Sequence, residues 1–597
     1  MCGIVGVALK SGDARRFLLR GLTALEYRGY DSAGMAFLNG DEVSRTAVAG
    51  RVGKLRRNSG KIGGITGIGH TRWATHGAPT ITNAHPIVAD TAAIVHNGII
   101  ENHAALRDEL KSAGRTFNTD TDTEVIAHLM AMALSDGADL LSAMKKTAAR
   151  LEGAFAIAAV AAGHDEIAFA RRGSPLMAAY GQDGCYVVSD TLALGDAAEH
   201  ITHLEDGDCG ILSADSVTII NAAGENVERT WTPPPETVST AVLGEYRHFM
   251  QKEIFEQPYA CSAPAQPYLR NKQVVPQKIG RGALQAFRRA KNVLILACGT
   301  SYHAGLVAKY WLRRFGIPCR VEIGSEYRHS PDAQAHESLA VAVSQSGETA
   351  DTLSALRAAK DDGATTIALV NSPTCTLSRE CEFVMRANAG PEIGVASTKC
   401  FTAQLVQLLV LSLSIAKARG KLSTAEESAA VSQLLELPGF IQRALLLEKD
   451  IRGWARIFAA SPSALFIGRH THYPLALEGA LKLKEISYLH AEGCAAGELK
   501  HGMLALIDDN MPVVGLLPDN ALAAKMESNL AEVAARNGKL FILGKTGENA
   551  IPVEDGGEWI SPIIYAVPLQ LLAYHTALEK GTDIDKPRNL AKSVTVE

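Results

Sequence analysis

The spacing of apolar positions changes character near residue 232. Before that point, short apolar runs of strand length dominate, with helical stretches at 102–112 and 123–134 between them. The strand-like runs are 67–70, 93–96, 155–158 and 186–188. This mixture predicts an α+β domain, a sandwich of sheets flanked by helices.

After three consecutive prolines at 233–235, strands and helices alternate. The continuous apolar runs 292–297 and 338–343 are typical of parallel strands buried on both faces, and 464–468 and 511–516 repeat the theme. We therefore expect two related parallel α/β domains. The predicted boundaries are 1–232 for the first domain, 233–284 for a linker with connecting helices, 285–425 and 455–580 for the α/β domains, and 581–597 for a C-terminal tail.

Composition narrows the class of protein. Hydrophobic residues make up 47% and charged residues 21%, which is typical of a soluble globular chain. A net charge of −5 over 597 residues favours neither nucleic acid nor an anionic membrane as a partner. The apolar segment around 405–411 is interrupted by Gln and Ser, so it predicts a core helix rather than a membrane span.

The cysteines and the N-terminus indicate a compartment. The 10 cysteines include no C-x-x-C pair, which argues against a zinc site or a disulfide framework. No charged segment precedes the first apolar residues, so we expect no signal peptide. A reducing cytoplasm is the expected location.

Cys2 is the first candidate for chemistry. Removal of Met1 leaves Cys2 with a thiol and a free α-amine on one residue. An α-amine titrates at about 7.7–8.0, below the thiol at about 8.5, so it can act as the base that activates the thiol. The alternative for Cys2 alone is a small buried residue that opens a first strand.

Three segments of the first domain offer groups that suit such a nucleophile. The segment 70–77 holds Arg72, one Trp and two His. Asn97 and Gly98 provide a side-chain amide beside a backbone N–H, a natural pair for an oxyanion. Asp122 precedes a helical stretch, where simple N-capping by Thr121 or Asp122 is the alternative function.

Two hydroxyl-rich turns follow strands of the first α/β domain. Backbone N–H groups and the positive end of a helix dipole converge where such turns lead into helices. Without the lysine of a Walker loop, the turns favour a phosphate monoester over a nucleoside triphosphate. Ordinary capping is the alternative for one turn alone. The hydroxyls belong to Thr300, Ser301, Ser344, Ser346 and Thr349.

The second α/β domain carries a charged stripe. Glu478, Lys482 and Glu485 are spaced to share one helix face, as either a solvated ion-pair stripe or a partly buried acid–base pair. His501 lies before a glycine and is either a helix-end residue or a proton shuttle. By composition alone, the segment around Lys592 is a terminal arm.

Together these motifs resemble the isomerising glutamine–fructose-6-phosphate aminotransferases, also called glucosamine-6-phosphate synthases. The resemblance covers nearly the whole chain, including 1–6, 25–34, both turns, 392–399, 480–486 and 588–597. It implies an N-terminal-nucleophile glutaminase domain of class II followed by two SIS-like sugar-isomerase domains. The glutaminase part lacks the long insertion of eukaryotic members, which favours a bacterial type.

The resemblance implies that Cys2 attacks the glutamine amide and that Asn97 and Gly98 stabilise the oxyanion. Arg72 is then the partner of the glutamine carboxylate and Asp122 that of its ammonium, with Thr75 and His76 also at the glutamine site. The tryptophan that matches Trp73 lines an ammonia channel in the family, whereas an isolated Trp is more often a core residue.

For the sugar half, the resemblance implies that His501 opens the ring and that Lys592 forms a Schiff base with the ketone. Ammonia then replaces Lys592, and Glu485, assisted by Lys482, moves a proton between C1 and C2. Residues expected to hold fructose 6-phosphate are Thr300, Ser301, Ser344, Gln345, Ser346, Thr349, Val395 and Ser397. No metal or organic cofactor is implied, and the family's usual state is a homodimer.

Two alternatives remain. A class II amidotransferase that aminates phosphoribosyl pyrophosphate needs an acidic-pair loop for ribose and pyrophosphate, which is not found after the linker. A non-catalytic sugar-phosphate sensor has no need of Cys2, Arg72, Asn97 and Asp122 together.

Overall fold

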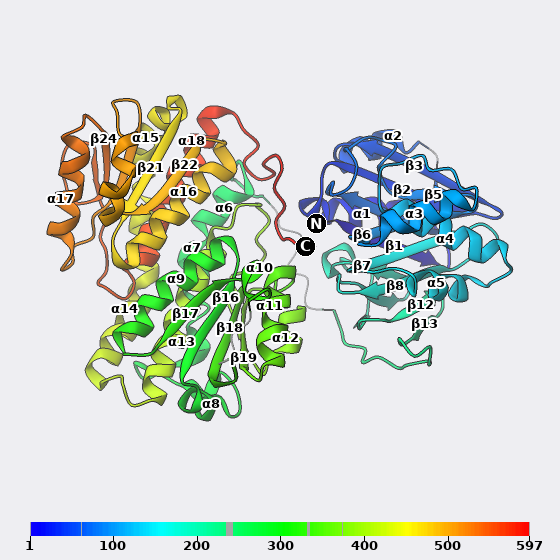
Figure 1. The fold of residues 1–597 in the computed structure, drawn as a ribbon, viewed down its shortest axis with the longest axis horizontal. Coiled ribbons are helices and arrows are strands. Elements are labelled where there is room, and N and C mark those ends of the chain that lie inside the picture. The colour runs from blue at the N-terminus through cyan, green and yellow to red at the C-terminus, as the bar shows by residue number, and fades with distance from the viewer. Residues whose placement is uncertain (1, 61, 235–242, 331–334, 373, 596–597) are drawn as a thin grey trace. The chain divides into compact units, whose positions relative to one another are not determined.

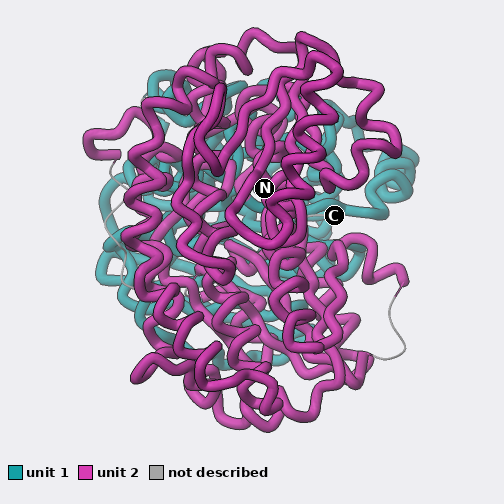
Figure 2. The backbone as a smooth tube through the Cα atoms, turned by 90° about the vertical axis from the view of Figure 1, so that its left-hand side faces the viewer, with its two compact units in different colours: residues 1–242, 593–597 teal, residues 243–592 magenta. Residues whose placement is uncertain are grey.

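The computed structural model describes residues 2–60, 62–234, 243–330, 335–372 and 374–595. The chain divides into two compact units, shown in different colours in Figure 2. Unit 1 comprises residues 1–242 and 593–597, and unit 2 comprises residues 243–592. Part of the predicted linker, including Pro235, lies outside the described residues.

Unit 1 contains two antiparallel sheets (Figure 1). Ile4 and Ala8 of the central strand β1 face the second sheet, and the alternate Val5 and Val7 face helices, as the period of two along a strand requires. The seven-stranded sheet has the order β11-β9-β10-β1-β4-β2-β3, with β1 Gly3–Leu9, β2 Ser32–Asn39, β3 Glu42–Ala49, β4 Thr66–Arg72, β9 Met177–Gly181, β10 Gly184–Val188 and β11 His200–His203. The six-stranded sheet has the order β13-β12-β8-β7-β6-β5, with β5 Ile87–Ala89, β6 Ala92–Gly98, β7 Phe155–Ala161, β8 Ile167–Arg172, β12 Cys209–Leu212 and β13 Val217–Ile220.

Helices cover the outer face of each sheet of unit 1. Apolar residues of α1 (Ala14–Ala24) and α2 (Val52–Asn58) share a core with the seven-stranded sheet. Those of α3 (His103–Ser112), α4 (Thr123–Ser135) and α5 (Leu140–Ala148) pack on the six-stranded sheet. The predicted α+β sandwich is therefore confirmed.

Unit 2 contains two parallel five-stranded sheets with the same strand order. The first has the order β17-β16-β18-β19-β20, with β16 Asn292–Ala297, β17 Cys319–Ile323, β18 Ser338–Ser344, β19 Thr365–Val370 and β20 Phe383–Arg386. The second has the order β22-β21-β23-β24-β25, with β21 Ser463–Gly468, β22 His490–Ala495, β23 Pro512–Leu516, β24 Lys539–Gly544 and β25 Ala550–Pro552. This repetition confirms two related α/β domains.

One large apolar core joins residues from both sheets of unit 2 with the long helices between them. The longer helices are α9 Gly299–Arg314, α11 Ala350–Asp361, α13 Lys399–Ala418, α14 Thr424–Leu445, α15 Glu448–Ala460, α16 Tyr473–Ser487, α17 Ala523–Ala534 and α18 Ser561–Lys580. The shorter ones are α6 Phe249–Phe255, α7 Gln257–Ser262, α8 Ala283–Arg289, α10 Gly324–Tyr327 and α12 Thr376–Glu380. A small hairpin pairs β14 Leu269–Arg270 with β15 Gln273–Val274. Helix α13 has the length and composition of a membrane span, yet its most apolar 18-residue window is 100% buried, as expected of a core helix.

The strand order of the first parallel sheet places the two hydroxyl-rich turns together. Strand β16 pairs with both β17 and β18, so the order of the sheet reverses beside it. The turn 298–301 follows β16 and the turn 344–349 follows β18. Both turns thus lie at the carboxyl ends of neighbouring strands, where open parallel sheets bind ligands.

Candidate active sites

Cys2 lies at the start of the central strand of unit 1. Because β1 pairs antiparallel with β4, the end of β4 meets the start of β1. The Cys2 Sγ accepts a hydrogen bond from the Trp73 backbone N–H at 3.2 Å and lies 3.5 Å from the Trp73 carbonyl oxygen. Burial raises the pKa of the Cys2 thiol. The thiol therefore needs a base before it can act as a nucleophile.

Asn97 and Gly98 end strand β6, beside Cys2. The Asn97 Nδ2 donates to the Cys2 carbonyl oxygen at 3.1 Å. The His70 Nε2 lies 3.1 Å from Asn97 Oδ1 and 3.0 Å from the His96 carbonyl oxygen. Both of these are acceptors, so Nε2 carries the proton, and burial lowers the pKa of His70 to about 3. Neutral His70 thus orients the Asn97 amide with its N–H₂ toward Cys2, a role that sequence reasoning missed.

Arg72 and Asp122 are buried and oppositely charged, at 3% and 4% exposure. Within the described part of the chain neither forms an ion pair. Arg72 donates to the carbonyl oxygens of His76, Gly77 (3.1 Å) and Ala78 (3.4 Å), and so folds the following loop around its guanidinium. Two unpaired charges of opposite sign suit a zwitterionic ligand.

Asp122 does not cap helix α4, although it occupies the N-cap position. Its Oδ2 instead accepts the Ile100 N–H at 2.9 Å. The simple capping interpretation of Asp122 is therefore wrong. Its carboxylate instead contacts the backbone of the segment that follows Gly98.

The loop that follows Arg72 carries the other candidates for glutamine binding. The Trp73 ring packs edge-on against Tyr30 with centroids 5.9 Å apart, and the His76 ring packs against His103 at 4.9 Å. Thr75 is exposed. The Asp31 Oδ2 accepts the Ala74 N–H at 2.9 Å and fixes the start of the loop, a second role that the sequence did not reveal.

In unit 2, the charged stripe on α16 is buried. The Lys482 Nζ lies 3.6 Å from Glu478 Oε1 and is ion-paired with Glu485, and Lys482 is 1% exposed. Burial alone lowers the pKa of Lys482, but Glu485 and Glu478 outweigh it and raise that pKa. Burial raises the pKa of Glu485 and outweighs the lowering by Lys482, and the neighbouring Glu478 carboxylate adds a smaller contribution in the same direction. The solvated-stripe alternative is wrong, and the arrangement suits proton transfer.

Residues of the first hydroxyl-rich turn contact the α16 stripe. Thr300 Oγ1 donates to Glu478 Oε1 at 3.0 Å, and His303 Nδ1 lies 2.7 Å from Glu478 Oε2. Helix α9, which contains Thr300 and Ser301 in its first turn, has no side-chain cap. Its N-terminal N–H groups are therefore not satisfied by the ordinary capping that was the alternative for this turn.

The second turn closes on itself. Ser344 Oγ accepts the Gly347 N–H at 3.0 Å and lies 3.0 Å from Thr349 Oγ1, and Ser346 Oγ accepts the Glu348 N–H at 3.2 Å. The Gln345 carbonyl oxygen accepts the N–H of Asn371 at 3.1 Å. Thr349 occupies the N-cap of α11 without a side-chain cap bond, as in the first turn.

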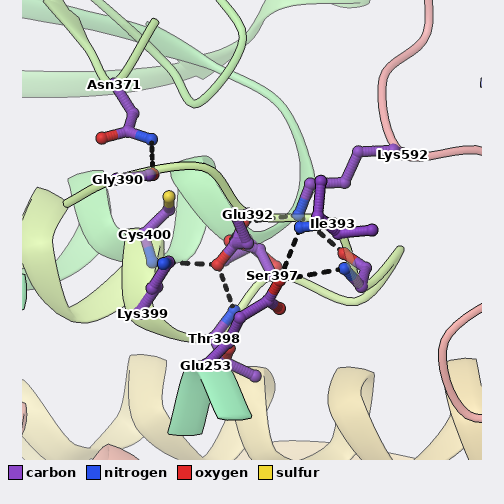
Figure 3. A network of polar contacts seen from close by, with 12 residues as sticks. Glu253, Asn371, Gly390, Glu392, Ile393, Ser397, Thr398, Lys399, Cys400 and Lys592 are labelled. Atoms are coloured by element: carbon purple, nitrogen blue, oxygen red, sulfur yellow. Dashed lines mark hydrogen bonds and ion pairs between the residues drawn. The ribbon is translucent and has the colours of Figure 1, made fainter. Parts of the chain in front are cut away.

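Lys592 is joined to a buried network (Figure 3). Its Nζ is ion-paired with Glu392 and donates to the Gly394 carbonyl oxygen at 2.8 Å. Glu392 also accepts from Ser397 Oγ at 3.0 Å. Burial acts to raise the pKa of Glu392, but Lys592 and backbone N–H groups lower it to about 2. The Val395 N–H, on the same segment, donates to the Asp585 carbonyl oxygen at 3.0 Å.

The network around Lys592 affects the pKa values of the charged residues of α16, but no described contact joins the His501 side chain to either group. Glu392 acts to raise the pKa of Lys482, and Lys592 acts to lower that of Glu485. His501, at the end of a short 3-10 helix (Ala496–His501), is exposed, and its side chain has no hydrogen bond to any described residue. Glu392 and His303 are residues of this site that sequence reasoning left unassigned.

Comparison with known proteins gives matches over the full length. The SIS-domain family matches residues 286–414 and 457–580, and the glutamine amidotransferase domain family matches residues 70–196. A glutamine–fructose-6-phosphate aminotransferase [isomerizing] of Bordetella parapertussis is 48% identical over 618 residues and covers 100% of both chains. The Pseudomonas aeruginosa protein of the same name is 47% identical with the same coverage.

Comparison with solved structures gives a match over part of the chain. The C-terminal domain of glucosamine-fructose-6-phosphate aminotransferase from Francisella tularensis is 42% identical, with a TM-score of 0.57. The match covers 58% of this chain and 100% of that one.

Proposed function

The chain belongs to the isomerising glutamine–fructose-6-phosphate aminotransferases, and we infer that it hydrolyses glutamine and transfers the ammonia to fructose 6-phosphate. The products are glutamate and glucosamine 6-phosphate. The observation that carries this conclusion is the full-length identity of 48%, which spans both the glutamine amidotransferase and the SIS regions.

Analysis of the products formed from both substrates tests this function. With glutamine and fructose 6-phosphate together, we expect equal amounts of glutamate and glucosamine 6-phosphate by chromatography. Phosphoribosyl pyrophosphate in place of fructose 6-phosphate should give no aminated product. Glutamate release without any aminated sugar would contradict the function.

For the first stage, we assign the attack on the glutamine amide carbon to the Cys2 thiolate. The freed α-amine takes the thiol proton once Met1 is removed. We assign stabilisation of the oxyanion to the Asn97 amide and the Gly98 N–H. The bond from Asn97 Nδ2 to the Cys2 carbonyl oxygen and the orientation of Asn97 by His70 support the assignment of Asn97. Arg72 takes the glutamine carboxylate and Asp122 its ammonium, as their unpaired charges support.

Gly98→Ala should reduce glutamine hydrolysis on the order of 10²-fold, as the loss of an oxyanion donor does. Gly98 has φ of +136°, and a Cβ there would lie 2.0 Å from the Ala154 carbonyl oxygen. The backbone must therefore move, and its N–H moves with it. Gly114→Ala is the matched control, because it also has positive φ (+84°) but meets no atom within 4 Å. Equal rates of glutamine hydrolysis by both variants would show that the Gly98 N–H is not an oxyanion donor.

For the second stage, we assign the phosphate to the two turns and the ketone to Lys592. The Lys592 amine adds to C2 of the sugar, water leaves, and an imine forms. Ammonia then displaces the lysine. Glu485, paired with Lys482, carries a proton between C1 and C2. We assign the opening of the sugar ring to His501.

The residues that we propose to contact the sugar phosphate lie in the two hydroxyl-rich turns and in the segment 392–399. Neutral hydroxyls, together with helix N-termini that have no side-chain cap bond, support a phosphate there. The proposed contact residues are Thr300, Ser301, Ser344, Gln345, Ser346, Thr349, Val395 and Ser397.

Trp73→Ala should leave glutamine hydrolysis substantial while the yield of glucosamine 6-phosphate per glutamate falls well below one. The Cys2 Sγ is bonded to the Trp73 backbone, which the substitution keeps. Ammonia that escapes to water becomes ammonium, which is not a nucleophile, so loss of an apolar gate uncouples the stages. Trp73→Phe, which keeps an apolar ring, is the control. Tight coupling in the alanine variant would make Trp73 a packing residue.

We also propose that the protein acts as a cytoplasmic homodimer on small-molecule substrates, without nucleic acid or membrane partners. The net charge of −5 and the family membership support this assignment. Sedimentation equilibrium should give twice the mass of one 63.5 kDa chain.

A further inference from the structure

Three carboxylates and two lysines lie in or beside the segment from Gly390 to Cys400 in unit 2. Glu392 is paired with Lys592, and Glu256 is paired with Lys399 at 2.7 Å. The third carboxylate, Glu253 on α6, is 2% exposed and forms no ion pair with any described residue. The mechanism described above gives it no role.

Glu253 is connected to the Lys592 amine through the backbone of one residue, Gly394; Figure 3 shows the surrounding network. Its Oε1 accepts the N–H groups of both Ile393 and Gly394, the latter at 3.1 Å. The carbonyl oxygen of Gly394 in turn accepts from Lys592 Nζ at 2.8 Å. The Glu253 Oε2 is buried and has no hydrogen-bond partner among the described residues.

An ionised Glu253 is unfavourable in these surroundings. Two cations are already matched by two carboxylates, so its charge has no counter-ion of its own, and one of its oxygens lacks even a hydrogen bond. Burial, with Glu392 as the next cause, raises the pKa of Glu253 to about 8. The titratable groups that face it or its helix are Glu392, Lys399 and Cys400 from the 390–400 segment, Lys592 and Asp585 from the C-terminal segment, and Lys252 and Glu256 nearby.

We propose that Glu253 is a positioning residue for Lys592: uncharged, it fastens the backbone of Ile393 and Gly394 and so holds the Gly394 carbonyl as the second acceptor for the lysine amine. This inference rests on the proposed role of Lys592 as the imine-forming residue.

An uncharged Glu253 matters because only the free amine attacks a ketone. With Glu253 neutral, Lys592 faces the single negative charge of Glu392. A second negative charge would stabilise the ammonium form and slow imine formation. The Gly394 carbonyl fixes the direction of the amine, and a misplacement of about 1 Å at a reacting atom can cost on the order of 10²-fold in rate.

Borohydride trapping of fructose 6-phosphate on Lys592, followed by peptide mass spectrometry, tests the inference. At pH 7 we expect Glu253→Gln to trap within about threefold of wild type, because the amide oxygen accepts the same two N–H groups. Glu253→Ala should trap at least about tenfold more slowly. Glu245→Gln, the same substitution at an exposed position eight residues earlier, is the control. Glutamine hydrolysis by unit 1 checks each sample.

The pH profile of trapping distinguishes a positioning role of Glu253 from a role that only stabilises the fold of the 390–400 segment. Below about pH 8, wild type and Glu253→Gln should coincide; above it, the variant should trap faster, because wild-type Glu253 ionises there. Superimposed profiles up to pH 9.5, or a Gln variant as slow as the Ala variant, would overturn the proposal. If the Ala variant does not fold, this comparison decides alone. No label on Lys592 in wild type would instead refute the proposed function of Lys592.

Discussion

Cys2→Ala is expected to abolish glutamine-dependent synthesis and to leave fructose 6-phosphate binding unchanged. The substitution removes the nucleophile, and losses on the order of 10⁴-fold or more follow when a covalent catalyst loses its attacking atom. The sugar residues all lie in unit 2, whereas Cys2 lies in unit 1. Glutamate release and calorimetric titration with fructose 6-phosphate measure the two effects.

Cys185→Ala is the matched control, because Cys185 is a free, buried thiol in the same unit. Protein whose intact mass still includes Met1 should be nearly as inactive as Cys2→Ala, because the nitrogen of Cys2 is then a peptide amide and cannot act as a base. Glutamate release by Cys2→Ala at the wild-type rate would assign the nucleophile elsewhere.

The strands of unit 2 could be predicted because parallel strands are buried on both faces. The runs 292–297 and 338–343 are uninterrupted by charge, and they form β16 and most of β18. Since the two strands pair directly, the turns that follow them had to meet. The pattern of apolar residues thus located the candidate phosphate site as well as the sheet.

Local patterns could not decide between capping and binding. Asp122 and Thr349 both occupy N-cap positions, and residues of these types usually cap helices. In the structure neither side chain caps its helix, because Asp122 bonds to Ile100 and Thr349 to Ser344. That outcome depends on which loop folds over each helix end, which the helix sequence does not contain.

Residues whose partners are distant in the chain were beyond prediction. Glu392 and Lys592 are 200 positions apart, and Thr300 and Glu478 are 178 apart. A lone glutamate such as Glu253 has no local pattern to mark it, since its role arises from burial beside charges of other segments. Tertiary packing alone creates these contacts.

Lys592→Arg should abolish synthesis while the protein stays as stable as wild type. The guanidinium remains protonated, so it cannot form an imine, and we expect a loss on the order of 10⁴-fold or more in glucosamine 6-phosphate formation. Its charge still pairs with the buried Glu392, so folding is retained. Borohydride with fructose 6-phosphate should label Lys592 in wild type and leave the variant unlabelled.

Lys592→Ala distinguishes the chemical role of this lysine from its structural one. It too should be inactive, but it leaves Glu392, whose side chain is 0% exposed, without its cation. Loss of one partner of a buried ion pair costs about 3–5 kcal/mol, so the alanine variant should unfold at lower denaturant than the arginine variant. Lys580→Arg, at the exposed end of α18, controls for the substitution itself. Synthesis by Lys592→Arg, or a label on another lysine, would show that the imine forms elsewhere.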